Sequence, residues 1–221
     1  MMRSRSTPTL LALLIAAGFS LQAAPAPAAS PQPQKQSLTN EAEQVHAWVA
    51  RSRDNKGLPF MIIDKKQAHL WVYDGAGRLQ GHAPVLLGSA RGDHTLPGIG
   101  SMKLSEIREE DRTTPAGRFV AETGINERRE RVVWVDYDAA VSMHPVLTAN
   151  ETEQRQHRLD TPTPADNRVS FGCINVPTAF HRDVVLGTVG EGRSVVYILP
   201  EVRPLHTVFP RAAPTATVAR R

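Results

Sequence analysis

The sequence predicts a mainly β domain with a short N-terminal helix and long loops. Short runs rich in β-branched and aromatic residues recur along the chain, separated by turns that contain Gly, Pro, Asp or Asn, as is typical of antiparallel sheets. Few stretches have the apolar spacing of an amphipathic helix. The runs expected to form strands are 60–63, 68–73, 81–87, 118–121, 131–137, 140–143 and 194–199.

Two helices and two long loops complete the expected domain. Val45, Trp48 and Val49 lie on one face of a helix expected over about 41–52, and a short helix is expected over 177–186. The polar segments 88–112 and 150–167 have no apolar period, so they are expected to be surface loops. Loops of this length in compact domains are often functional.

The N-terminal sequence has the pattern of a secretory signal peptide. Arg3 and Arg5 precede an apolar run over 10–19, and small residues and prolines follow. This order predicts a signal peptide over 1–29, and the apolar run is too short to span a bilayer comfortably. We therefore expect export across the inner membrane to the periplasm or cell envelope, with no stable membrane insertion after cleavage.

The remaining chain is expected to form one domain with flexible ends. Residues 30–57 are expected to be a linker followed by the N-terminal helix, because the sequence is first rich in Pro and Gln. Residues 58–210 are long enough for one domain with its own core. The last stretch, 211–221, has no periodicity and is expected to be a disordered tail.

Charge and composition exclude some classes of function. The formal net charge is +4, aromatic residues make up 5% of the chain, and no basic run is interleaved with aromatics, which argues against nucleic acid as a partner. A mildly basic exported domain suits an anionic envelope polymer. Six of the histidines lie far apart without the spacing of metal ligands, so no metal site is expected.

Cys173 is the only cysteine, so it has no partner for an internal disulfide, and a lone thiol in an oxidising compartment needs an explanation. It follows Gly172, and a glycine beside a nucleophile lets substrate approach and lets backbone N–H groups turn inward to bind an oxyanion. A thiol requires a base or a nearby positive charge to become a thiolate. His144, at the end of an expected strand, is the best candidate.

The segment around Cys173 resembles the signature of the L,D-transpeptidase catalytic domain, or YkuD domain. That signature is a histidine, a spacer, and then Ser/Thr-His-Gly-Cys-hydrophobic-Asn/Arg. Five positions of this chain match it: Ser170, Gly172, Cys173, Ile174 and Asn175. The strands over 63–73 resemble the family's opening strand pair, and 114–119 resembles its Thr-Pro-x-Gly-x-Phe turn.

The resemblance implies a β-sandwich-like fold and an acyl transfer without cofactors. Cys173 would attack a carbonyl of a peptidoglycan stem peptide and form a thioester, with His144 as the base and N–H groups around Gly172 and Cys173 as the oxyanion hole. A second stem peptide would accept the acyl group, and carbapenems would acylate the same thiol. The residues expected to contact substrate are Ser170, Asn175, Arg168 and Phe171.

Three departures from the family pattern leave alternatives open. Phe171 replaces the usual histidine, Pro145 follows His144 where glycine is common, and the spacer over 145–169 is longer than usual. The long spacer leaves His157 as a rival base. Phe171 and Pro145 alter the acceptor side, which leaves open a carboxypeptidase or amidase that transfers the acyl group to water. Phe171 and the long spacer leave open a peptidoglycan-binding module with little turnover.

Overall fold

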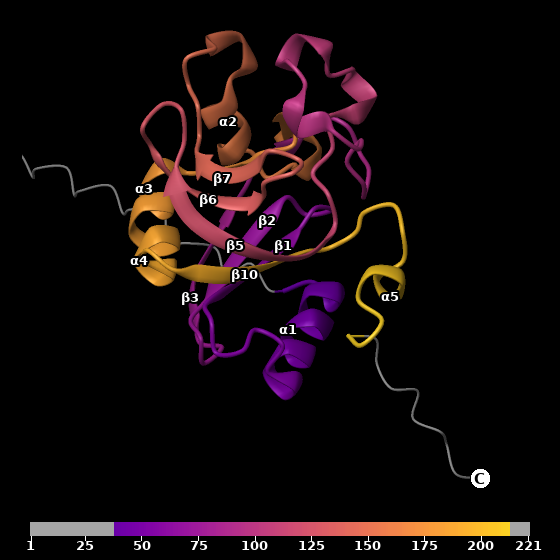
Figure 1. Ribbon diagram of the computed structural model, residues 1–221, viewed down its shortest axis with the longest axis vertical. Helices are drawn as coiled ribbons and strands as arrows, with labels where there is room; N and C mark the ends of the chain where they lie inside the picture. The colour runs from indigo at the N-terminus through magenta and orange to yellow at the C-terminus, as the bar shows by residue number, and fades with distance from the viewer. Residues whose placement is uncertain (1–37, 213–221) are drawn as a thin grey trace, which may run out of the picture. The chain divides into compact units, whose positions relative to one another are not determined.

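The computed structural model of the chain describes residues 38–212. The expected signal peptide, most of the expected linker and residues 213–221 of the expected tail lie outside this range. Figure 1 shows a large sheet with helices around it. The strands are β1 (Phe60–Asp64), β2 (His69–Tyr73), β3 (Leu79–Pro84), β4 (Leu87–Gly88), β5 (Gly117–Ile125), β6 (Arg131–Asp136), β7 (Val141–Pro145), β8 (Arg168–Ser170), β9 (Ile174–Val176) and β10 (Arg193–Ile198). The helices are α1 (Asn40–Ser52), α2 (Arg155–Asp160), α3 (Thr178–Phe180), α4 (Leu186–Val189) and α5 (Leu205–Val208).

Eight strands form one mixed sheet in the order β3-β2-β1-β10-β5-β6-β7-β9, and β4 pairs with β8 in a separate two-stranded sheet. Two neighbouring pairs of the large sheet are parallel, β1 with β10 and β7 with β9. The others are antiparallel. β10 therefore joins the N-terminal strands to the strands from the middle of the chain.

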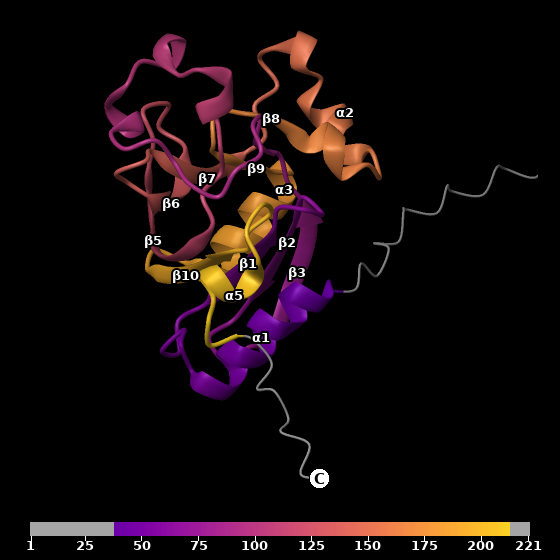
Figure 2. The same ribbon diagram turned by 90° about the vertical axis from the view of Figure 1, so that its right-hand side faces the viewer.

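The two faces of the sheet build two separate hydrophobic cores. One core contains Met61, Leu70 and Met143, and Val185 covers it from the helical segment 178–189. The other lies where α1 and α5 cover β1, β2 and β10, beside each other in Figure 2. Alternating side chains of the central strands thus serve both cores, which explains why β1 and β2 are buried at every position.

α1 packs against the sheet and is part of the compact domain. The Thr39 side chain accepts a hydrogen bond from the Ala42 N–H and caps the helix. The expected apolar stripe, Val45, Trp48 and Val49, is buried against the sheet. The compact part of the described chain therefore begins before residue 58.

The expected fold class, mainly β with a short N-terminal helix and long loops, is confirmed. The strand bounds differ in places, the expected strand over 81–87 is divided between β3 and β4, and the short strands β8 and β9 were not expected. The expected helix and loops differ in three further places. The helix expected over 177–186 is a broken segment in which a π-helical turn, His181–Val185, joins α3 to α4. The loop over 88–112 contains three single-turn 3-10 helices, and the loop over 150–167 contains α2 and two more such turns.

Within residues 38–212, no helix is long and apolar enough to cross a membrane.

Candidate active site

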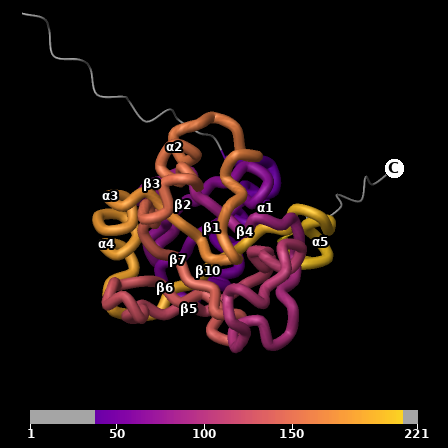
Figure 3. Tube along the Cα trace, turned by 90° about the horizontal axis from the view of Figure 1, so that it is seen from above, coloured from indigo at the N-terminus to yellow at the C-terminus, as the bar shows by residue number. Residues whose placement is uncertain are grey.

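Cys173 lies in the turn between β8 and β9, next to the end of β7. The parallel pairing of β7 with β9 places Met143 opposite Ile174 and His144 opposite Asn175. This register brings residues from the end of β7 beside the turn that carries Cys173. The two long loops lie at this same end of the sheet, and Figure 3 shows it from above.

A cleft of about 250 Å³ opens at this point, with Cys173 and His144 among its lining residues. Trp134 of β6 and Leu147 of the loop after β7 form apolar parts of its wall. The turn between β5 and β6 supplies charged and polar groups. These are Asn126, Glu127, Arg128 and Glu130.

The His144 ring is held in a defined orientation. Its Nδ1 lies 2.8 Å from the Pro145 carbonyl oxygen, and a carbonyl only accepts, so Nδ1 carries the proton in the neutral ring. The other ring nitrogen, Nε2, then has a free lone pair. His144 is 8% exposed, so packing also restrains the ring, as a general base requires.

The thiol of Cys173 is half-buried and has several polar neighbours. Its Sγ lies 3.8 Å from the Ser142 hydroxyl and 3.5 Å from the Ala140 carbonyl oxygen. Burial raises the pKa of this thiol, but the neighbouring His144 and Ser142 outweigh burial and lower the pKa overall. The thiol is therefore poised for nucleophilic chemistry.

Ser170 forms hydrogen bonds within the turn and does not line the cleft. Its buried hydroxyl donates to the Cys173 carbonyl at 2.6 Å and accepts from the Gly172 N–H at 3.1 Å. The Gly172 N–H is therefore engaged, contrary to the expectation that it binds an oxyanion. The N–H of Cys173 remains as the candidate donor in this turn.

The other three expected substrate contacts also lie outside the lining of the cleft. Asn175 is fully buried, and its Oδ1 accepts from Arg155 at 2.7 Å. Arg168 forms an ion pair with Glu201, and Phe171 lies under the guanidinium of Arg112 at 4.2 Å from the ring centroid. These side chains serve the framework around the turn.

His157 lies apart from the thiol. It is exposed on α2 and lines a different cavity of about 420 Å³, together with Asn150, Gln154 and other residues of the same loop. The structure thus brings His144, and not His157, to Cys173.

Sequence reasoning missed several residues of this site. Ser142 has a clear signal, because it lies two positions before His144 on a strand and such residues share a face. Trp134, Ala140 and the charged turn over 126–130 have no such signal, since their position depends on how the β5–β6–β7 strands pair. Among residues 38–212, no three His, Cys, Asp or Glu side chains lie close enough to hold a metal ion.

Replacing Gly172 by Ala is expected to destabilise the turn by about 1–3 kcal/mol and to slow alkylation of Cys173. Gly172 has a φ of 130°, and an added Cβ would lie 2.8 Å from the Thr113 carbonyl oxygen. Urea unfolding measures the loss. Gly187→Ala is the matched control, because a Cβ there meets nothing within 4 Å. Equal effects of the two changes would contradict this account of Gly172.

Comparisons with known proteins give likeness of structure alone. No family model matches the sequence, and no curated protein matches it. Many matching solved structures are L,D-transpeptidase catalytic domains. The catalytic domain of the Enterococcus faecium L,D-transpeptidase is 17% identical, with 64% of this chain and 96% of that chain covered and a TM-score of 0.33.

Two further structures show a similar likeness. The helical cell shape determining protein Pgp2 from Campylobacter jejuni is 13% identical, with 71% of this chain and 55% of that chain covered and a TM-score of 0.46. An L,D-transpeptidase from Xylanimonas cellulosilytica is 15% identical, with 63% and 59% covered and a TM-score of 0.38. The chain spans about half, 49%, of two other L,D-transpeptidase structures that it matches.

Proposed function

We propose that the protein is an exported cysteine acyltransferase that crosslinks peptidoglycan stem peptides by L,D-transpeptidation. The observation that carries the proposal is the pair formed by Cys173 and His144, a thiol with a lowered pKa beside a histidine whose Nε2 is free. A nucleophile next to an oriented base is the arrangement of covalent acyl transfer. The motif around Cys173 supports peptidoglycan as the substrate.

The first half of the reaction forms a thioester. The proton of the Cys173 thiol passes to His144 Nε2, and the thiolate attacks the carbonyl that joins an L-centre to the following D-residue. The Cys173 N–H faces the oxyanion that develops. The C–N bond then breaks, and the proton on His144 passes to the departing amine, so the D-residue leaves with its amino group intact.

The second half transfers the acyl group to an amine of a second stem peptide. The amine attacks the thioester carbonyl and gives its proton to His144, and the C–S bond breaks to restore the thiolate. The cleft is lined by Glu127 and Glu130, with Arg128 between them in the sequence. The two carboxylates would attract the acceptor as an ammonium ion, which releases a proton to water before the neutral amine attacks. Glu130 is fixed by the Asn126 side chain at 3.0 Å. Among the described residues, neither carboxylate forms an ion pair, so both remain available to an ammonium group.

The test uses the mature protein and disaccharide tetrapeptides, with products identified by mass spectrometry. A crosslinked dimer that has lost one D-amino acid is the expected product, and Cys173→Ala is expected to yield none. Intact mass after incubation with a carbapenem is expected to show one adduct, which Cys173→Ala lacks. Product formation by Cys173→Ala at the wild-type rate would overturn the proposal.

Two other outcomes would assign one of the remaining functions. A shortened monomer with no dimer would mean that water receives the acyl group, as in a carboxypeptidase. No product, together with slow alkylation of Cys173 that does not depend on pH, would favour a peptidoglycan-binding module. His157→Ala serves as the control variant, and its product yield is expected to equal that of the wild type.

A further inference from the structure

The segment 112–114 is wedged between Gly88 of β4 and the turn that carries the nucleophile. A Cβ on Gly88 would lie 2.2 Å from the Arg112 carbonyl oxygen, and one on Gly172 would lie 2.8 Å from the Thr113 carbonyl oxygen. Neither glycine could carry a side chain without moving this segment. The backbone of the segment therefore packs closely against both neighbours, and the side chain at position 114 reaches the turn directly.

The hydroxyl group of Thr114 forms hydrogen bonds with both Gly88 and Gly172. Its Oγ1 accepts from the Gly88 N–H at 2.9 Å and donates to the Gly172 carbonyl at 2.8 Å. Thr114 is fully buried. A hydroxyl has one proton, so the donor is committed to Gly172.

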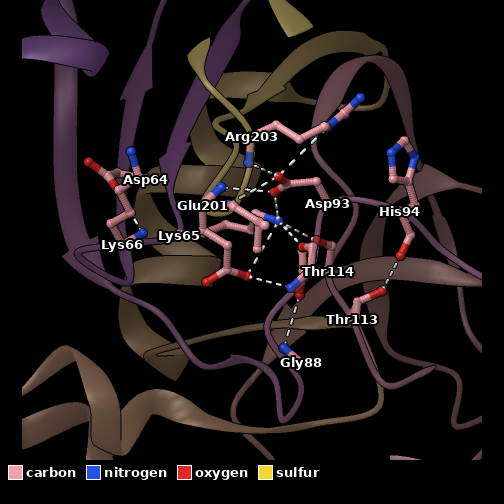
Figure 4. A network of polar contacts seen from close by, with 12 residues as sticks. Asp64, Lys65, Lys66, Gly88, Asp93, His94, Thr113, Thr114, Glu201 and Arg203 are labelled. Atoms are coloured by element: carbon pink, nitrogen blue, oxygen red, sulfur yellow. Dashed lines mark hydrogen bonds and ion pairs between the residues drawn. The ribbon is translucent and has the colours of Figure 1, made fainter. Parts of the chain in front are cut away.

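A buried charge cluster fixes Thr114 from the other side, as Figure 4 shows. Lys65, which is fully buried, donates from Nζ to the Thr114 carbonyl at 2.8 Å and to the Asp93 carboxylate at 2.9 Å. Its third donor goes to the Gly92 carbonyl. Asp93 in turn accepts backbone N–H bonds from Glu201 at 2.8 Å and Arg203 at 2.7 Å. Thr114 is thus anchored to the β1 end and to the segment after β10.

The geometry points to Thr114, held by Lys65, as the positioning residue that aims the Cys173 N–H at the developing oxyanion. The Gly172 carbonyl and the Cys173 N–H belong to one planar trans peptide unit, so they point in opposite directions. Fixing the carbonyl toward Thr114 therefore fixes the N–H away from it. This inference rests on the proposed acyl transfer, because only a reaction with an oxyanion uses that N–H.

The test compares two reactions of the same thiol. Iodoacetamide displaces iodide at a saturated carbon and forms no oxyanion, whereas p-nitrophenyl acetate forms a thioester through one and releases p-nitrophenolate. Thr114→Val keeps the shape and removes the hydroxyl. The expected result is a loss in the rate of thioester formation of about 10- to 100-fold, below the usual effect of deleting an oxyanion donor. The alkylation rate is expected to stay within about threefold of the wild-type rate. The pH midpoint of alkylation is expected to stay unchanged. Thr114→Ser is expected to restore the acylation rate.

Thr123→Val is the matched control, because the Thr123 hydroxyl donates to the carbonyl of another glycine, Gly190, at 2.9 Å. This variant is expected to have a lower melting temperature and an unchanged ratio of the acylation rate to the alkylation rate. If Thr114→Val does not fold, Thr114→Ala removes the same hydroxyl with less bulk beside Gly88. Equal losses in both reactions, or no loss in either, would overturn the inference. Both probes act without stem peptides, so their outcome is independent of whether peptidoglycan is the substrate.

Discussion

Replacing His144 by Gln is expected to lower turnover of stem peptides by about 10²- to 10⁴-fold, the usual contribution of a general base. The same change is expected to move the pH profile of Cys173 alkylation upward. The sign follows from the causes of the pKa shift, because burial alone raises the pKa of the thiol and His144 is the main group that lowers it. Without His144, the thiolate therefore forms only at higher pH.

The rate of alkylation by iodoacetamide is measured between about pH 5 and about pH 10, the range in which thiols generally titrate. His157→Gln is the matched control, because His157 is exposed and lines a different cavity. The pH midpoint of Cys173 alkylation and the turnover of stem peptides in this variant are expected to equal those of the wild type. An unchanged midpoint in His144→Gln, or a shift in His157→Gln, would show that another group activates the thiol.

Replacing Lys65 by Met is expected to lower the free energy of unfolding by about 3–5 kcal/mol, as when one partner of a buried ion pair is removed. Lys65 and the side chains of Asp93 and Glu201 are almost completely buried, and the Lys65 Nζ lies 2.9 Å and 3.5 Å from their carboxylates. Methionine fills similar volume but leaves two buried carboxylates without this ammonium group. Urea unfolding at pH 7 measures the loss.

The matched control is Arg78→Ala, which removes the exposed partner of Asp74 in a surface ion pair. Its effect is expected to stay below about 1 kcal/mol. A loss for Lys65→Met no larger than that of the control would contradict the assigned role of the buried cluster.

The cluster also predicts how stability depends on pH. Burial raises the pKa of the Asp93 carboxyl, but the N–H groups of Arg203 and Glu201 and the Lys65 ammonium group outweigh it and lower the pKa to about 2. A carboxyl whose folded pKa is lowered stabilises the fold above its unfolded pKa. This contribution is therefore expected to fall between about pH 4 and pH 2. The difference in melting temperature between wild type and Lys65→Met is expected to narrow over the same interval.

Local patterns predicted the parts of this fold whose conformation depends on neighbours in sequence. The apolar stripe of Val45, Trp48 and Val49 identified α1, and runs such as 194–199 identified the central strands. Cys173 could also be singled out from the sequence as a candidate nucleophile, since it is the only cysteine and lies after a glycine. His144 was readable as the residue at the end of an expected strand.

The parts that depend on distant segments were not predictable in this way. β8 and β9 have three residues each, too few for a period to emerge. Lys65 reads as a surface residue, and only the fold shows that Asp93, Glu201 and two carbonyl groups surround its ammonium group. For the same reason, Asn175 and Arg168 were expected in the cleft, whereas long-range partners hold them in the framework. Ser170 was also expected there, but its hydroxyl bonds within its own turn.

The central place of β10 has a consequence for how the chain folds. β10 is the last strand of the described chain, yet it is the strand that joins β1 to β5. In a chain synthesised only to about residue 190, β1 and β5 lack the strand that pairs with both of them, so the large sheet is divided into β3-β2-β1 and β5-β6-β7-β9. Closure then requires contacts between residues as distant as Phe60 and Val195, and such non-local pairing slows folding. We therefore expect the sheet to close late, after residue 198 has left the ribosome or translocon.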